Sequence, residues 1–139
     1  MNADTTHDLS AMQLPGRMFE VEMVYIASGA GDLGRAFHPD VVVHEPATLP
    51  YPGDWKGPDG VGALFHKMRE VWSEMRVQDM QAVREGDRVY MAGTIHLTSR
   101  ATGASAIQPF AEVLQFRNGL LIEGTPFYFD TGELDAILS

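Results

Sequence analysis

Apolar residues in the first half of the chain follow a helical period, and they predict three helices. Residues 17–28 place large apolar side chains three and four positions apart, until a Ser-Gly-Ala-Gly run ends the pattern. A short second helix is expected over residues 33–37, because the carboxylate of Asp32 can accept hydrogen bonds from its free first-turn amides. A third helix opens at Asp59-Gly60. Its apolar residues form one stripe: Val61, Leu64, Phe65, Met68, Val71 and Trp72.

The second half of the chain follows a period of two, which is typical of strands. Between the helices, the β-branched run 41–45 predicts one short strand, and the proline- and glycine-rich residues 46–60 predict a loop. Asn118-Gly119 is the strongest hairpin signal, because both residues tolerate the positive φ of a tight turn. The later strands are expected at 75–85, 88–99, 105–116 and 120–129, followed by a helical turn at 130–138.

Helices followed by a run of hairpins indicate an α+β fold, with helices on one face of an antiparallel sheet. We expect a strongly curved sheet, bent with the help of Gly93 and Gly124, that encloses one apolar pocket. No internal repeat or second domain is visible in the pattern. The expected organisation is therefore a loose tail at residues 1–16 and a single domain at residues 17–139.

Composition and charge disfavour several classes of binding partner for this protein. The chain of 139 residues carries a net charge of −9, and its ten basic residues do not cluster, which disfavours nucleic acid and anionic membranes. The absence of cysteine excludes disulfides and thiol nucleophiles. The polar N-terminus lacks the apolar stretch of a secretory signal, so we expect a cytoplasmic protein.

Glu112 is the most informative candidate for chemistry. Strand alternation places it on one face with Phe110, Leu114 and Phe116, and a carboxyl among apolar neighbours is unusual. Loss of water there would raise the pKa of Glu112 and let the protonated acid donate a hydrogen bond to an oxyanion. The alternative is a carboxylate at the sheet rim that is paired with a lysine or arginine.

Several phrases of the sequence occur in an order and spacing that resemble a known superfamily. They are Ala30-Gly31-Asp32-Leu33, then Pro39-Asp40-Val41-Val42-Val43-His44-Glu45-Pro46, the segment 49–61, and Arg117-Asn118-Gly119 with the strand after it. Together they resemble the nuclear-transport-factor-two-like superfamily, within it the SnoaL-like and ketosteroid-isomerase-like proteins, over residues 17–138. The resemblance implies a cone-shaped α+β barrel whose three N-terminal helices cover the pocket, and a homodimer formed through the convex face of the sheet.

The resemblance also implies roles for single residues. Glu112 matches the strand acid, which is Asp in the family, and Glu45 stands before Pro46 where the isomerases carry a proton-shuttling Asp. His44 alternates with Glu45, so only one of the two is expected to face inward. Tyr128 falls on the pocket-lining face of the last strand, and Tyr25 lies within one residue of the oxyanion-hole tyrosine.

The remaining candidates are residues expected to line the pocket. A stripe at helical spacing is more often ordinary core, and a single histidine on a mixed strand face, such as His96, is most often a surface residue. The candidate lining residues are Trp55, Phe65, Met68, Trp72, His96, Phe110, Leu114 and Ile122.

Metal chemistry is not expected, because the histidines show no ligand spacing and His44-Glu45 is not followed by a second histidine at position 48. The function predicted is therefore a cofactor-independent acid–base enzyme of isomerase, cyclase or dehydratase type. Its substrate would be a small hydrophobic carbonyl compound, such as a polyketide or a steroid-like molecule. In this scheme Glu112 is the acid or oxyanion donor and Glu45 or His44 the base. The alternative is a non-catalytic protein of the same fold that binds a small hydrophobic molecule.

Overall fold

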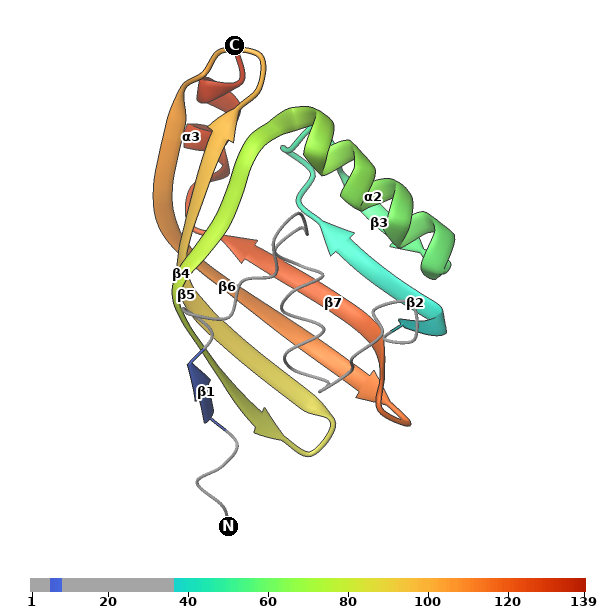
Figure 1. The fold of residues 1–139 in the computed structure, drawn as a ribbon. Coiled ribbons are helices and arrows are strands. Elements are labelled where there is room, and N and C mark those ends of the chain that lie inside the picture. Colours follow the sequence, from blue (N-terminus) through green and yellow to red (C-terminus); the bar gives the residue numbers. More distant parts are fainter. Residues whose placement is uncertain (1–5, 9–36) are drawn as a thin grey trace.

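The computed structural model describes residues 6–8 and 37–139, which form one curved sheet of seven strands with two helices (Figure 1). Across the sheet the strand order is β1-β4-β5-β6-β7-β2-β3. This arrangement confirms the predicted α+β class. The strands are β1 (Thr6–Asp8), β2 (Phe37–Glu45), β3 (Gly53–Lys56), β4 (Trp72–Glu85), β5 (Arg88–Ser99), β6 (Ser105–Arg117) and β7 (Leu120–Tyr128), and the helices are α2 (Gly57–Val71) and α3 (Thr131–Ile137).

The sheet is mixed, so the prediction of a wholly antiparallel sheet is wrong. Strands β4 to β7 form an antiparallel meander, but β2 pairs with β7 in parallel. The short strand β3 then pairs antiparallel with β2. The sheet is curved (Figure 1). Its two edges, β1 and β3, do not pair with each other, so the described strands form an open sheet and not a closed barrel.

Two short strands lie where the sequence predicted irregular chain. Residues 6–8 of the expected tail pair with the free edge of β4 as β1, and residues 53–56 of the expected loop pair with the free edge of β2 as β3. Both strands are too short to carry a clear period-two pattern, so their formation depends on the strand edge beside them.

The helices agree with the prediction only where they are described. The helices expected at residues 17–28 and 33–37 lie outside the described residues, except that Phe37 begins β2 instead of ending a helix. The cover of three helices therefore stays a prediction. Helix α2 has Pro58 in its first turn, and it buries Val61, Leu64, Phe65 and Met68 along the stripe that the sequence predicted.

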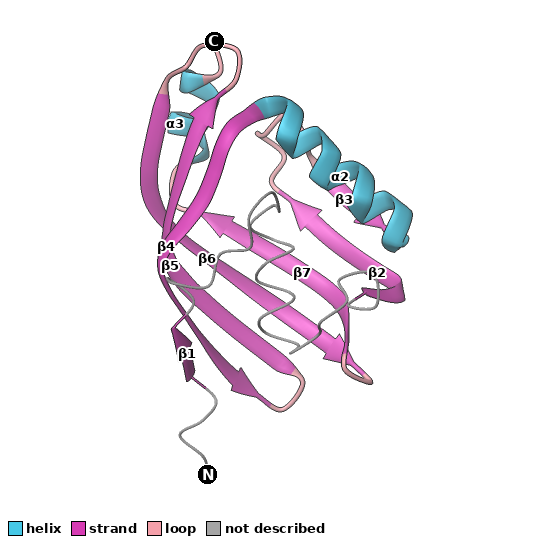
Figure 2. Cartoon of the chain, viewed as in Figure 1, coloured by secondary structure: helices cyan, strands magenta, loops and turns pink. Residues whose placement is uncertain are grey.

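Helix α2 lies along the part of the sheet formed by β2 and β3, and α3 lies beside the first residues of β6 (Figure 2). Asp130 caps α3 by accepting a hydrogen bond from the amide of Glu133. The buried Gln108 of β6 fastens this helix to the sheet, since its amide nitrogen donates to Glu133 Oε1 at 2.8 Å. Among the described residues, no helix has the length and apolarity needed to cross a bilayer.

A bulge in β4 explains one of the two sheet glycines. The pairing of β4 with β5 shifts between Gln78 and Gln81, and Asp79 takes a left-handed backbone with φ of 56°. The bulge turns the fully buried Met80 across Gly93 of β5. A Cβ on Gly93 would lie 2.8 Å from the Met80 Cα and 3.0 Å from the Asp79 carbonyl oxygen. The backbone of β4 thus occupies the place of a side chain at position 93.

We expect Gly93→Ala to destabilise the fold by about 1–3 kcal/mol, because the added methyl group overlaps backbone atoms that cannot move freely. Gly62→Ala is the matched control, since a Cβ at this α2 position meets nothing within 4 Å. The control should stabilise the fold by up to about 1 kcal/mol through helix propensity. Urea unfolding of both variants makes the comparison, and equal stabilities would contradict the packing argument.

Candidate functional site

Two buried glutamates face the inner, concave side of the sheet from strands on either side of β7. Glu112 of β6 pairs with Pro126, and Val43 of β2 pairs with Gly124. Glu45 lies two residues beyond Val43 on the same face, so the parallel register places it beside Pro126 as well. Only 6% of Glu45 and 3% of Glu112 is exposed to solvent. The fold therefore brings the two predicted carboxyls together.

Glu112 is surrounded by apolar groups on all four sides within the sheet. Met91 and Pro126 lie opposite it on the neighbouring strands, and Phe110 and Leu114 lie before and after it on β6. Gly124 leaves room near the carboxyl, because a Cβ there would lie 3.6 Å from Glu112 Oε2. The face that alternation predicted for Glu112 is thus the buried face of β6.

These carboxyls lack the hydrogen bonds that buried acids usually make. Within the described part of the chain, neither oxygen of Glu45 nor Oε1 of Glu112 has a hydrogen-bond partner. Pro126, which lies between the two glutamates, has no N–H to donate. Since a buried polar group without a partner costs roughly 1–3 kcal/mol, this arrangement is not explained by stability.

Burial raises the pKa of both groups. Loss of water, followed by the charge of Glu112, raises the pKa of Glu45 to about 9. Loss of water raises the pKa of Glu112 to about 8. Because each carboxyl affects the other, they titrate as a pair, and the pair keeps protons at neutral pH. Such a pair can donate hydrogen bonds to a developing oxyanion and can accept a proton once one member is ionised.

Tyr128 packs beside this pair. Its ring lies 5.1 Å from the ring of Phe110, centroid to centroid, in a tilted arrangement, and the residue is half-buried. Phe110 and Leu114 are fully buried on the same face. These three residues bring apolar and aromatic surface next to Glu112, as expected for a site that takes a hydrophobic molecule.

His44 lies on the opposite, outer face of β2. Its Nδ1 is 2.7 Å from Asp54 Oδ1 on β3, and its Nε2 is 2.7 Å from Glu123 Oε2 on β7. Partial burial lowers the pKa of His44, but the hydrogen bonds and charges of the two carboxylates outweigh this, and the pKa lies above 6.5. Of the two competing residues, the structure turns Glu45 inward and His44 outward.

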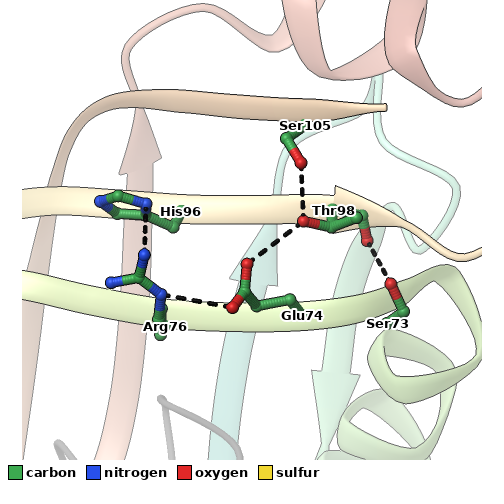
Figure 3. Close-up of polar contacts among 6 residues, drawn as sticks. All are labelled: Ser73, Glu74, Arg76, His96, Thr98 and Ser105. Carbon is green, nitrogen blue, oxygen red and sulfur yellow. Dashed lines mark hydrogen bonds and ion pairs between the residues drawn. The ribbon is translucent and has the colours of Figure 1, made fainter. Parts of the chain in front are cut away.

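His96 of β5 also lies on the outer face, so the sheet separates it from the glutamate pair on the inner face. Its Nδ1 accepts a hydrogen bond from Arg76 at 3.0 Å, beside a polar ladder that joins Glu74, Thr98 and Ser105 (Figure 3). This arrangement corresponds to the surface-residue alternative that the sequence left open.

The predicted aromatic lining residues meet at a tyrosine that sequence reasoning missed. Trp72 donates its indole N–H to the hydroxyl of Tyr51 at 2.7 Å, and Trp55 donates to the Tyr51 carbonyl at 3.2 Å. Tyr51 is fully buried although it stands in the proline-rich segment that predicted a loop. Its only signal in the sequence was a large aromatic residue among turn residues. Trp72, Phe65 and Met68 are buried in the same core, and Trp55 is partly buried against it.

A second irregularity, in the pairing of β6 with β7, changes the position of Ile122, which the sequence predicted to line the pocket. The pairing of β6 with β7 shifts between Gln115 and Phe116, so Phe116 pairs with Leu121 and Ile122 is the extra residue. Leu121 is consequently buried in the core, and Ile122 is only partly buried. Strict alternation could not reveal this bulge. Tyr25 lies outside the described residues.

Two hollows are lined by described residues. One, of about 380 Å³, includes Glu45 and Tyr128 together with His44, Pro46 and Thr131. The other, of about 450 Å³, lies mainly on the outer face, beside Phe127 and Phe129. Within residues 6–8 and 37–139 no group of three histidine, aspartate or glutamate side chains is arranged so that it could hold a metal ion. The single enclosed pocket on the inner face stays a prediction.

Comparison with known families identifies the fold as well as the class of protein. The model of the SnoaL-like domain family matches residues 17–124, which is most of the chain. The protein therefore belongs to the SnoaL-like domain family. No curated protein matches the chain.

Solved structures with a similar fold carry varied descriptions. One is an NTF2-like protein of unknown function from Burkholderia pseudomallei, with 29% identity, a TM-score of 0.69, and coverage of 75% of this chain and 80% of that one. TerC co-crystallised with polyporic acid has 22% identity, a TM-score of 0.68 and coverage of 85% and 97%. A predicted polyketide cyclase from Pseudomonas putida has 17% identity, a TM-score of 0.68 and coverage of 86% and 95%. At such identities the last two show the fold alone.

The raised pKa values predict that the fold loses stability as pH rises. The ordinary pKa of a glutamate side chain is 4.5, and this value applies to the unfolded chain. Between about pH 5 and pH 8 the unfolded chain has therefore released the two protons that the folded pair still holds. Each carboxyl then lowers the free energy of unfolding by about 1.4 kcal/mol per pH unit. Glu112→Gln should remove one such contribution and be more stable than the unmodified protein at pH 7.

Urea unfolding at pH 5, 6 and 7 measures this slope. Glu85→Gln is the control, because Glu85 is an exposed carboxylate at the end of β4. If Glu112→Gln and the unmodified protein had the same slope, Glu112 would not be a protonated buried acid.

Proposed function

We propose that the protein is a cofactor-independent acid–base enzyme acting on a small hydrophobic carbonyl compound, such as a polyketide or a steroid-like molecule. The observation that supports this proposal best is the buried pair Glu45 and Glu112, three of whose four carboxyl oxygens have no hydrogen-bond partner among the described residues. Membership of the SnoaL-like family is consistent with it, and one structure of similar fold is described as a predicted polyketide cyclase.

The proposed chemistry needs one carboxyl of the pair to be protonated and the other to be ionised. The ionised carboxyl removes a proton from the carbon next to the substrate carbonyl, and the protonated carboxyl donates a hydrogen bond to the enolate oxygen that forms. Return of the proton to another carbon gives isomerisation. Attack of the enolate carbon on a second carbonyl gives cyclisation, and loss of a β-hydroxyl as water gives dehydration.

Within this proposal the base is a carboxyl of the pair and not His44. Both ring nitrogens of His44 are 2.7 Å from carboxylates on the outer face, away from Glu112. Tyr128 supports the pair from β7 by packing on Phe110. A cytoplasmic location and the absence of a cofactor stay predictions of the sequence.

Exchange of α-hydrogens for deuterium tests the step that all three reactions share. The α-hydrogens of polyketide-like β-dicarbonyl compounds and of steroid 3-ketones in D₂O should be replaced by deuterium faster when the protein is present than when it is absent. Proton NMR measures this exchange. Glu45→Gln and Glu112→Gln should each lower this rate about 10²- to 10⁴-fold, the usual contribution of a positioned acid or base. Glu85→Gln should leave it unchanged.

The rate of α-hydrogen exchange should also depend on pH, because it follows the protonation of Glu45 and Glu112. Activity requires one proton on two carboxyls, so it should rise with pH, reach its maximum between about 8 and 9, and fall above that. A maximum near pH 5 would contradict the assignment of this pair as the acid and base.

The second candidate function is binding of a small hydrophobic molecule without catalysis. It is favoured by the apolar surroundings of Glu112, and TerC, which shares the fold, was co-crystallised with polyporic acid. In that case Glu112→Gln keeps the ligand affinity, and no exchange of α-hydrogens depends on Glu112.

We also propose that the protein is a homodimer through the outer face of β5, β6 and β7. The outward positions at the centre of these strands carry no charge although the chain has a net charge of −9. Four large apolar residues are exposed on these strands or directly after β7: Tyr90 (42%), Ile107 (61%), Phe127 (54%) and Phe129 (75%). Exposed apolar surface of this kind is typical of an interface between subunits.

Light scattering measures the mass directly. The unmodified protein should have twice the 15.3 kDa mass of the chain, and Ile107→Lys with Phe129→Asp should have the mass of one chain. Lys67→Glu, an exposed change on α2, should leave the dimer intact. A mass of one chain for the unmodified protein at high concentration would refute the dimer.

A further inference from the structure

The end of β2 carries a buried acid on one face and an ionisable histidine on the other. Glu45 faces the apolar interior, and the next residue towards the N-terminus, His44, faces outward between Asp54 and Glu123. Two ionisable side chains that are adjacent in the sequence thus lie on opposite faces of the strand, His44 in contact with solvent and Glu45 buried.

The regular pairing on the β7 side stops before Glu45. The parallel pairing of β2 with β7 includes Val42 and ends at Val43, opposite Gly124. The other partner of β2, β3, is an edge strand of four residues. Beyond Glu45 comes Pro46, which has no N–H for the ladder. Side-chain contacts across the three strands are thus an important part of what fixes the end of β2.

His44 supplies such contacts to both neighbouring strands at once. It pairs with Asp54 in the β2–β3 register, and Glu123 lies opposite Val42 on β7. The two distances of 2.7 Å require an N–H at each ring nitrogen, since carboxylates only accept hydrogen bonds. Only the protonated imidazole has both, so the neutral ring must give up one of the two contacts.

From these contacts we infer that His44 is a positioning residue for Glu45: protonated, it links β3, β2 and β7 and fixes the Glu45 carboxyl against Glu112. The inference rests on the proposed function of the glutamate pair. It adds a solvent-facing group that adjusts the pair without touching the substrate. The hollow of about 380 Å³ beside His44, Glu45 and Thr131 lies at the same end of the strand.

Other charged and polar groups lie on this face but do not contact His44. Lys56 lies on β3 two residues beyond Asp54, and Asp40 lies on β2 four residues before His44. On β6 the outward neighbour of Glu123 is the neutral Gln115, which accepts a hydrogen bond from Arg88. Among the described residues, only Asp54 and Glu123 are recorded in contact with His44.

The link is strongest at low pH. The carboxylates hold the pKa of His44 above 6.5, against the opposing effect of burial, so both contacts exist below pH 6.5 and one is lost as pH rises through the folded value. Such exposed ion pairs contribute little to overall stability. Their expected effect is on the position of β2.

The test is a titration of carboxyl carbons and imidazole by NMR on the full chain. The Glu45 signal should show a small inflection where His44 loses its proton, well before its own titration near pH 9. Asp54→Asn and Glu123→Gln should each lower the pKa of His44 toward 6.5 and move the inflection with it. In both variants amide exchange in residues 41–45 should be roughly two- to tenfold faster.

Asp40→Asn is the matched control, because it removes an exposed carboxylate from the same strand and the same face. It should leave the Glu45 inflection where it is in the unmodified protein. If Glu45 has a raised pKa but no inflection, or one that Glu123→Gln and Asp54→Asn leave in place, the inference is wrong and the proposed function stands. If Glu45 titrates at its ordinary value, both are wrong.

Discussion

The structure depends most on a single electrostatic constraint, the burial of two carboxyl groups on the concave face of one sheet. Glu45 and Glu112 approach each other from strands that flank β7, and no described residue donates a hydrogen bond to either oxygen of Glu45 or to Oε1 of Glu112. Both groups avoid the cost of burying charge by holding their protons. Well-packed hydrophobic residues at these two positions would give a more stable fold, so the stability of the fold does not explain the carboxyls.

Much of the architecture serves to bring β2 and β6 to either side of β7. The parallel pairing of β2 with β7 places Glu45 at the end of its strand level with Pro126, and the antiparallel meander places Glu112 at the same level from the other side. The bulge that presses Met80 against Gly93 interrupts the regular pairing of β4 with β5 and adds local twist. Gly124 then leaves the space beside the Glu112 carboxyl open.

The outer face has a separate chemistry. An uncharged apolar centre on β5 to β7 is flanked by the polar ladder of Glu74, Arg76 and Thr98 on one side and by the His44 cluster on the other. One sheet thus carries two buried carboxyls on its inner face and exposed apolar side chains on its outer face. Strand alternation allows this, because neighbouring residues such as His44 and Glu45 serve opposite faces.

The sequence by itself determined the class of fold, the boundaries of β5, β6 and β7 to within a residue or so, and the strand face on which Glu112 lies, because these follow from local period and turn chemistry. The burial of that face, and with it the choice against a rim carboxylate, came from the structure. Membership of the family was visible in the order of short motifs. Only the tertiary structure decided that β2 runs parallel to β7, that Glu45 and not His44 turns inward, and that Tyr51 joins the core. It also decided the bulges that bury Met80 and displace Ile122. The reason is that register, bulges and strand edges depend on the partner strand, and contacts between distant segments leave no periodic signal in either segment alone.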